Sequence, residues 1–334
     1  MAARDKGSRR KWIWILMATL VVSAGCVREE QVEGGGEGGG EPATQRLSVA
    51  TGTTGGVYVI YGGGLADLMT DELEGVEATA EVTSASVDNM LLIADESSDV
   101  AFTLADTAAD GVEGEAAFDE QVPAQALANL YVNYTQVGTI AGTGIETIDD
   151  LRNKTVSLGS PNSGTEVIAL RILEAAGIDP DEDIGREQLD VEQSVQALRD
   201  GSIDAFFWSG GLPTGAVTDL ASTDDLVLVP TDQYTEDLAS QYGPFYSATA
   251  IPADSYPGLE EDVPTIGVPN YLVVNESMEE DLAFEITELL FEHKSDLVKV
   301  HPEAKNLDLE TATETTPLEL HPGAERYYEQ AQGG

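Results

Sequence analysis

The chain has 334 residues, of which 61 are Asp or Glu and 16 are Lys or Arg, so its formal net charge is −45 at pH 7. A surface this acidic repels nucleic acid and anionic lipid, which argues against both as partners. Hydrophobic residues make up 42% of the chain and recur periodically, so the acids coat a folded body rather than indicate disorder. This excess of acidic over basic residues is typical of a halophilic protein, because concentrated salt screens the repulsion between like charges.

The first 25 residues have the pattern of a secretory signal segment. Five basic residues precede an apolar run over residues 12–22, and Ser23, Ala24 and Gly25 follow it. The run is about half of the roughly 20 residues that span a bilayer, so a permanent transmembrane helix is the weaker interpretation. Residues 8–13 are similar to a twin-arginine export motif, so the general and the twin-arginine export routes both stay open.

Cys26 is the only cysteine, which excludes a disulfide framework and a thiolate metal cluster. Its position after Ser-Ala-Gly resembles the lipobox of secreted lipoproteins, where lipid is attached to the thiol after cleavage; a chance free cysteine is the alternative. Residues 26–45 then form a lipid anchor and a flexible tether, because the stretch QVEGGGEGGGEPATQ is dominated by glycine. We therefore expect an extracytoplasmic lipoprotein at the outer face of the cytoplasmic membrane.

Residues 46–334 form the folded body, in which predicted strands and helices alternate. Strands are expected over residues 47–51, 76–82, 100–104, 155–158 and 203–208. Helices are expected over residues 57–73, 86–94, 164–176 and 191–198. This alternation predicts an α/β fold with parallel sheets wound in βαβ units.

Two such runs follow one another, which predicts two lobes. Lobe 1 is expected over about residues 46–135 plus 250–334, and lobe 2 over about residues 136–249. The extended segments NYTQVGTIAG and FYSATAIPADSYPG are interpreted as crossings between the lobes. The C-terminal part of the chain then returns to lobe 1, and the cleft between the lobes is the expected ligand site.

Four loops of small and polar residues each precede a predicted helix: residues 52–58, 83–89, 159–165 and 208–214. Glycine lets backbone N–H groups approach a ligand closely, and a helix N-terminus adds partial positive charge. Several such N-termini at one cleft would hold a small anion without arginine. The alternatives are a tight turn without ligand for residues 52–58, a helix cap for residues 83–89, and a core position for Trp208.

The sequence offers little that an enzyme would need. Residues 50–55 match the dinucleotide fingerprint only loosely, and both Gly-Lys-Ser/Thr and Gly-x-Ser-x-Gly are absent. The only histidines, His293, His301 and His321, lie near the C-terminus, which argues against a catalytic triad or a histidine metal site. Surface or capping positions fit them better. We expect no catalytic residue, no metal and no cofactor.

An ordered series of motifs resembles the TAXI-type solute receptors of TRAP transporters. It comprises ATGTTGGVY with GGGLADLM, TSASVDNMLLIADESSDVAFTLADTA, SLGSPNSGTEVIALRILEAAGI, VQALRDGSIDAFFWSGGLPTGAVTDLA, YPGLEEDVPTIGVPNYLVV and LHPGAERYYEQ. The resemblance covers almost the whole body, and the series is specific although each glycine motif alone is weak. The chain departs from the family at Ala85, where glycine is expected.

The resemblance implies a two-lobed, type II periplasmic-binding-protein-like fold that closes over its ligand. It implies capture of a small organic anion, of the glutamate, dicarboxylate or keto-acid class, and its delivery to TRAP membrane permease subunits driven by an ion gradient. Carried over by position, the ligand-binding residues are Gly55, Gly56, Tyr58, Ser84, Ser86, Asn89, Asn162, Ser163, Gly164, Thr165, Trp208, Gly210, Gly211 and Pro213. If the ligand is glutamate, Asp106 or Glu166 is the candidate partner of its ammonium group.

Two other functions remain open at this point. One is an exported nucleotide- or dinucleotide-dependent enzyme that uses the glycine-rich loop, which nicotinamide absorbance in the purified protein would support. The other is a surface protein with a structural or adhesive role. It predicts a filled or flat interface between the lobes, whereas a receptor predicts closure that depends on the ligand.

Overall fold

The computed structural model describes residues 44–333 of the chain. The predicted signal segment, the lipid attachment at Cys26 and the tether up to residue 43 lie outside the described residues. Within residues 44–333 no helix combines the length and the apolar character that crossing a membrane requires.

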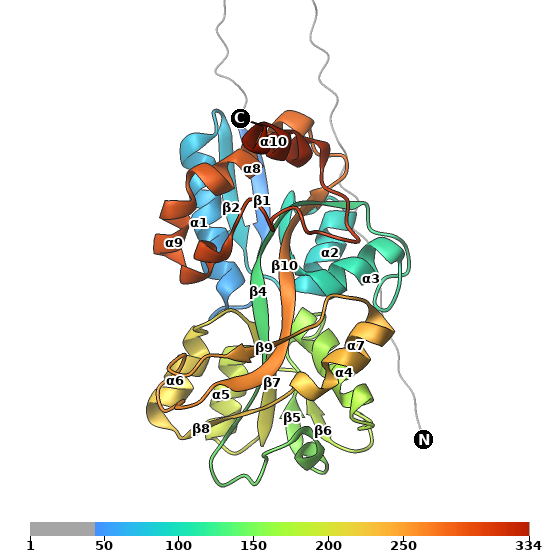
Figure 1. Ribbon diagram of the computed structural model, residues 1–334, viewed down its shortest axis with the longest axis vertical. Helices are drawn as coiled ribbons and strands as arrows, with labels where there is room; N and C mark the ends of the chain where they lie inside the picture. Colours follow the sequence, from blue (N-terminus) through green and yellow to red (C-terminus); the bar gives the residue numbers. More distant parts are fainter. Residues whose placement is uncertain (1–43, 334) are drawn as a thin grey trace, which may run out of the picture. The chain divides into compact units, whose positions relative to one another are not determined.

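Two long strands, β4 (Ala124–Ile140) and β10 (Val263–Asn275), run antiparallel to one another through the middle of the body. They join two groups of elements into one mixed sheet with the strand order β2-β1-β3-β10-β4-β7-β5-β6. Strand β8 pairs with β4, and β9 pairs with β10, off this path. We call the two groups lobe 1 and lobe 2; they occupy the upper and the lower half of Figure 1.

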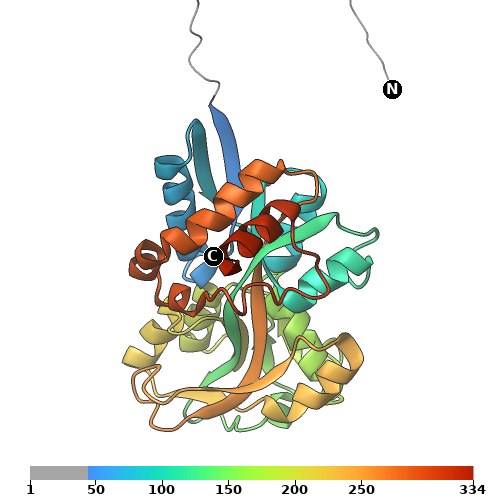
Figure 2. The same cartoon turned by 45° about the horizontal axis from the view of Figure 1, so that its top comes forward.

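Lobe 1 has a parallel arrangement of β1 with β2 and β3, next to the antiparallel β10. Its elements are β1 (Gln45–Ala50), α1 (Val57–Glu72), β2 (Val76–Glu81), α2 (Ser86–Ala94), β3 (Val100–Leu104), α3 (Ala105–Glu113), α8 (Glu280–Glu292), α9 (Lys294–Val300), η3 (Pro302–Asn306) and α10 (Pro322–Gln332). Figure 2 shows α8 and α10, in orange and dark red, packed together across one face of this lobe.

Lobe 2 repeats the parallel arrangement, with β5 between β6 and β7. Its elements are η1 (Ile148–Leu151), β5 (Thr155–Ser157), α4 (Gly164–Ala175), β6 (Gly185–Glu187), α5 (Val191–Arg199), β7 (Ala205–Gly210), α6 (Gly215–Thr223), β8 (Leu226–Val229), η2 (Asp232–Tyr234), α7 (Thr235–Tyr242) and β9 (Ser247–Ile251). Strand β7 continues the sheet by pairing antiparallel with β4.

The core explains why these segments adopt these structures. All five residues of β3 are buried, as expected for a strand with helices on both faces. One apolar cluster fills lobe 1 beneath α1 and α8, with Leu65, Met69 and Ile286 among its members. A second cluster contains residues of α2 in lobe 1 and of α4 in lobe 2, including Met90 and Ile172, so apolar packing continues from one lobe into the other.

The predicted strands and helices agree with the structure to within about two residues at each end. Two expectations need correction. The sheet is mixed rather than parallel, because β4 and β10 run against their neighbours. The segment 245–258 holds only the short strand β9, and β10 makes the return crossing beside β4 instead.

Candidate functional site

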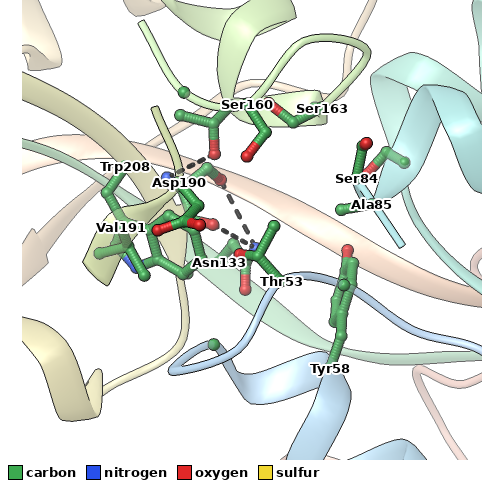
Figure 3. A pocket seen from close by; sticks show the side chains of 18 of the residues that line it. Thr53, Tyr58, Ser84, Ala85, Asn133, Ser160, Ser163, Asp190, Val191 and Trp208 are labelled. Atoms are coloured by element: carbon green, nitrogen blue, oxygen red, sulfur yellow. Dashed lines mark hydrogen bonds between the residues drawn. The ribbon is translucent and has the colours of Figure 1, made fainter. Parts of the chain in front are cut away.

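A narrow pocket lies between the two lobes and is lined by both (Figure 3). Its volume is about 30 Å³, which is room for about two water-sized groups. The lining residues are Gly52, Thr53, Gly56, Val57, Tyr58, Ser84, Ala85, Ser86, Leu104, Tyr131, Asn133, Gly159, Ser160, Ser163, Gly164, Thr165, Leu189, Asp190, Val191, Trp208, Ser209 and Gly210.

Four helices begin at this pocket, two from each lobe. The pocket is lined by the first residues of α1 and α2 in lobe 1 and of α4 and α5 in lobe 2. The first N–H groups of a helix have no partner within the helix, and its dipole places partial positive charge there. None of the described residues that line the pocket is arginine or lysine, so helix ends and hydroxyl groups provide its attraction for an anion.

The first loop approaches lobe 2 closely because it contains glycine. Gly55 has φ +80°, in the left-handed region that favours glycine, and a side chain there would collide with Glu192 at 2.9 Å. A Cβ on Gly56 would lie 3.1 Å from the Trp208 ring. Thr54 also donates a hydrogen bond to Glu192 at 3.2 Å. The loop therefore combines positions open to the pocket with direct contacts between the lobes.

The loop before α2 contains a strained residue. Ala85 lines the pocket with φ 84° and ψ −141°, a conformation that glycine tolerates and alanine does not. This is the position where the family motif led us to expect glycine, and the backbone supplies the physical reason. The strain is stored at the wall of the pocket itself.

The second-lobe loop is held by hydrogen bonds that its own hydroxyl groups accept. Ser163 caps α4 by accepting a hydrogen bond from the Glu166 amide at 3.1 Å. Thr165 accepts one from the Ser209 amide at 3.1 Å. Each hydroxyl oxygen therefore accepts a hydrogen bond from the backbone, while its own hydrogen stays available to donate to an anion.

Nine of the fourteen residues carried over by position line the pocket: Gly56, Tyr58, Ser84, Ser86, Ser163, Gly164, Thr165, Trp208 and Gly210. Trp208, for which a core position was an alternative, is one of its walls, and its indole N–H donates to Thr214 at 2.9 Å. The Tyr58 hydroxyl donates to the Asn270 side chain, and burial raises the pKa of Tyr58 well above its usual value.

The other five, Gly55, Asn89, Asn162, Gly211 and Pro213, lie outside the pocket lining. The Asn89 amide donates to the carbonyl groups of Ala50, Thr51 and Phe102, so it ties strand ends together behind the pocket.

The other predicted residues outside the lining lie at contacts or turns beside the pocket. The Asn162 carbonyl accepts a hydrogen bond from the Asp88 amide at 3.2 Å, which joins the lobes. Gly211 packs against Glu303, and Pro213 follows in the same loop.

Neither candidate partner for an ammonium group lines the pocket. Asp106 is buried and bonded to Arg171 and Tyr246. Glu166 is paired with Arg186 at 2.6 Å and accepts a second hydrogen bond from Gln188. Both carboxylates face other groups of the protein, so neither serves as an ammonium partner in this arrangement.

Several residues that line the pocket were not among those predicted from the sequence. Asp190 caps α5 by accepting a hydrogen bond from the Gln193 amide at 2.7 Å, and a helix-start pattern would have found it. Asn133 and Tyr131 come from β4, where only the register of the sheet directs them to the site. Thr53, Ser160 and Ser209 sit in or beside loops already considered.

Metal chemistry has no support in residues 44–333, since no group of three His, Cys, Asp or Glu side chains there is placed to hold an ion. Two of the histidines have capping positions, as expected. His301 and His321 each accept a backbone hydrogen bond through Nδ1 at 3.2 Å, at the start of η3 and of α10.

Comparison with known proteins gives a family and a fold. The family model described as NMT1-like family matches residues 49–331. A solved structure described as a periplasmic transporter aligns with a TM-score of 0.54 and 14% identity, covering 88% of this chain and 98% of the other. MatC of Rhodopseudomonas palustris with bound malate aligns with a TM-score of 0.53 and 12% identity, covering 86% and 96%. These two structural matches confirm the predicted two-lobed α/β fold.

Proposed function

The chain belongs to the NMT1-like family, and from this premise we propose that it is an extracytoplasmic solute receptor of the TAXI type. It captures a small organic anion between its lobes and delivers the ligand to a TRAP-type secondary transporter. The motif series of the body supports the finer assignment, while family and fold support the coarser one, a solute-binding protein of a transporter.

The convergence of four helix N-termini on one buried pocket is the observation that carries this proposal. The N–H groups that stay unbonded at these helix ends and the partial positive charges there stabilise an anion, and the low dielectric of a closed cleft strengthens the interaction. The net charge of −45 opposes anion binding at long range, so capture depends on contacts at short distance and on salt that screens the surface.

The ligand belongs to the class of glutamate, dicarboxylates or keto-acids. MatC, which has a similar fold, holds malate, a small dicarboxylate. Tyr58 and Trp208 wall the pocket on its apolar sides, and hydroxyl and backbone groups provide the polar contacts. Because the pocket measures only about 30 Å³, an organic acid enters when the lobes move apart and is held when they close.

The proposal also includes attachment to the membrane. Lipid on Cys26 and the glycine-rich tether would keep the receptor close to its permease at the outer face of the cytoplasmic membrane. Incorporation of labelled fatty acid into the protein, and its loss in Cys26→Ser, tests this part. A Cys26→Ser protein that is still labelled would contradict it.

Thermal unfolding in molar salt, with a panel of organic acids and amino acids, tests ligand capture. A ligand at one hundred times its dissociation constant adds about 2.7 kcal/mol to the free energy of unfolding, which raises the midpoint by several degrees. No shift with any acid, in protein from which bound small molecules have been extracted and identified, would contradict an organic-anion receptor. Uptake into vesicles containing the permease, driven by an ion gradient without ATP, tests delivery.

A further inference from the structure

Asn133 has a buried side-chain oxygen without a partner at the wall of the pocket. The residue lies on β4, is 3% exposed and lines the pocket. Its Nδ2 donates to the Ser209 carbonyl at 3.2 Å and approaches the Ser209 hydroxyl at 3.5 Å. Its Oδ1 has no hydrogen-bond donor within the described residues.

The orientation of this amide follows from its neighbour. The Ser209 carbonyl can only accept hydrogen bonds, so the side-chain nitrogen must face it and the oxygen must point elsewhere. Figure 3 shows Asn133 among the residues that surround the pocket. A buried acceptor without a donor is unfavourable, and a ligand that donates a hydrogen bond would remove this cost.

A second acceptor belongs to the same pocket. One oxygen of Asp190 caps α5, and the side chain lines the pocket. The other polar contributions are hydroxyl groups, which can donate as well as accept, and helix N-termini, which donate. The site is therefore divided by chemistry: most of its groups suit a carboxylate, whereas Asn133 and Asp190 suit a donor.

We propose that Asn133 is a specificity-determining residue, which selects ligands with a hydroxyl or ammonium group close to their carboxylate. Asn133 and the helix N-termini line the same pocket, so a donor group that reaches Asn133 lies near the carboxylate that those N-termini hold. A 2-oxo acid of the same skeleton presents a carbonyl oxygen to the Asn133 oxygen, which leaves both acceptors unpaired. This inference rests on the proposed function, and it removes keto-acids from the preferred ligands.

Calorimetric titration of the purified protein with matched acids tests the inference. The probes are 2-hydroxyglutarate, glutamate and 2-oxoglutarate, followed by malate, aspartate and oxaloacetate. In at least one set we expect the hydroxy or the amino acid to bind about tenfold or more tightly than the oxo acid. Comparing the hydroxy acid with the amino acid of the same set shows whether the site prefers a hydroxyl or an ammonium group.

Variants at residue 133 test whether the side-chain oxygen, rather than the shape of the pocket, causes the preference. Asn133→Leu keeps the approximate volume and removes the acceptor. The hydroxy or amino acid and the matching oxo acid should then bind this variant with about equal affinity. Asn133→Asp keeps an acceptor but adds a negative charge, so all six acids should bind more weakly while the preference persists. Asn129→Leu, on the same strand but outside the pocket lining, is the matched control and should bind like the unmodified protein.

The outcomes distinguish this inference from the function on which it rests. Equal affinity for oxo and donor-bearing acids in the unmodified protein would overturn the role of Asn133 and leave the receptor intact. An undiminished preference in Asn133→Leu would do the same. If none of the six acids binds, organic-anion capture itself fails.

Discussion

Arg171 and Asp106 form a buried ion pair that joins the two lobes at 3.3 Å, with side-chain exposures of 8% and 0%. Arg171 belongs to α4 of lobe 2 and Asp106 to α3 of lobe 1. The guanidinium group also contacts Asp110 at 2.6 Å and the Tyr246 hydroxyl at 2.7 Å. Burial raises the pKa of Asp110, while the charge of Arg171 acts in the opposite direction.

Replacing Arg171 with Met should lower the free energy of unfolding by about 3–5 kcal/mol, because Asp106 would be left as a buried charge without a positively charged partner. Adding Asp106→Asn should recover part of this loss. Arg326→Met, at a more exposed pair on α10, should change stability by less than about 1 kcal/mol. Urea unfolding measures all three, and an equal loss in both arginine variants would contradict the role of burial.

Gly164→Ala should obstruct closure of the lobes. A methyl group on Gly164, in lobe 2, would lie 2.5 Å from Leu104 and 2.7 Å from Ser86, both in lobe 1. Overpacking of this kind costs about 1–3 kcal/mol, so ligand affinity should fall about tenfold or more while the open protein stays folded. Gly63→Ala is the control, since nothing lies within 4 Å of that position. It should stabilise α1 by about 0.5–1 kcal/mol without affecting binding, and equal affinity in the two variants would argue against the contact.

Ser84→Ala and Ser160→Ala should weaken ligand binding with little effect on stability. Both residues line the pocket, and neither hydroxyl makes a hydrogen bond within residues 44–333. Each variant should lose about 0.5–1.5 kcal/mol of binding. Ser163→Ala should also cost about 1 kcal/mol of folding stability, because it removes the cap of α4. Titration beside thermal unfolding separates the two effects, and unchanged affinity in both pocket variants would remove these hydroxyls from the site.

Ala85→Gly should relieve backbone strain at the start of α2. The residue has φ 84°, which costs a side chain about 1–3 kcal/mol and glycine very little. The greater entropy of glycine in the unfolded chain offsets part of the gain, so we expect a net increase of about 1 kcal/mol in the free energy of unfolding. Ala94→Gly, at the other end of α2, should be destabilising instead. A loss of stability in Ala85→Gly would show that the backbone there is relaxed.

Stability should decrease as the pH falls below about 6.5, the ordinary value for histidine. Burial lowers the pKa of His301 and of His321, and at His321 the hydrogen bond to the Met278 carbonyl and the charge of Glu280 oppose the shift. The unfolded state then binds more protons than the folded state, so stability is full above pH 6.5 and is lost as the pH falls toward the lower folded values. Protonation also removes the Nδ1 acceptor that caps η3 and α10.

Denaturant unfolding at pH 7 and pH 5.5 measures this effect. The double variant His301→Asn and His321→Asn retains a capping acceptor without a titrating ring, so its pH dependence should be weaker. His321→Ala should be less stable at both pH values by about 1 kcal/mol, because the cap is absent throughout. If the double variant loses as much stability between pH 7 and pH 5.5 as the unmodified protein, groups other than these two histidines cause the loss.

Local patterns were sufficient to predict the helices and strands around the pocket. The apolar periodicity of residues 164–176 and the small-residue loop before them predicted α4 and its place at the site. The glycine-rich loop before α1 was predicted in the same way. These signals depend on residues within about four positions of one another, which is the range over which helix periodicity and capping act.

The direction of the crossing strands could not be predicted locally. Strand β10 pairs with β3, β4 and β9 at once, and these partners are distant in the sequence. The position of Asn133 in the pocket follows from that register, since neighbouring residues of a strand point to opposite faces.

Nearby residues and composition were enough to predict the alternation of strands and helices, the loops at helix N-termini and the acidic surface. Which polar groups remain available to a ligand depends on how the lobes fold and pack. Asp106 and Glu166 are engaged by Arg171 and Arg186, whereas the Asn133 oxygen is left without a donor. Charges and hydrogen bonds act through space, so the partners of a side chain are settled only when the lobes are folded and packed together.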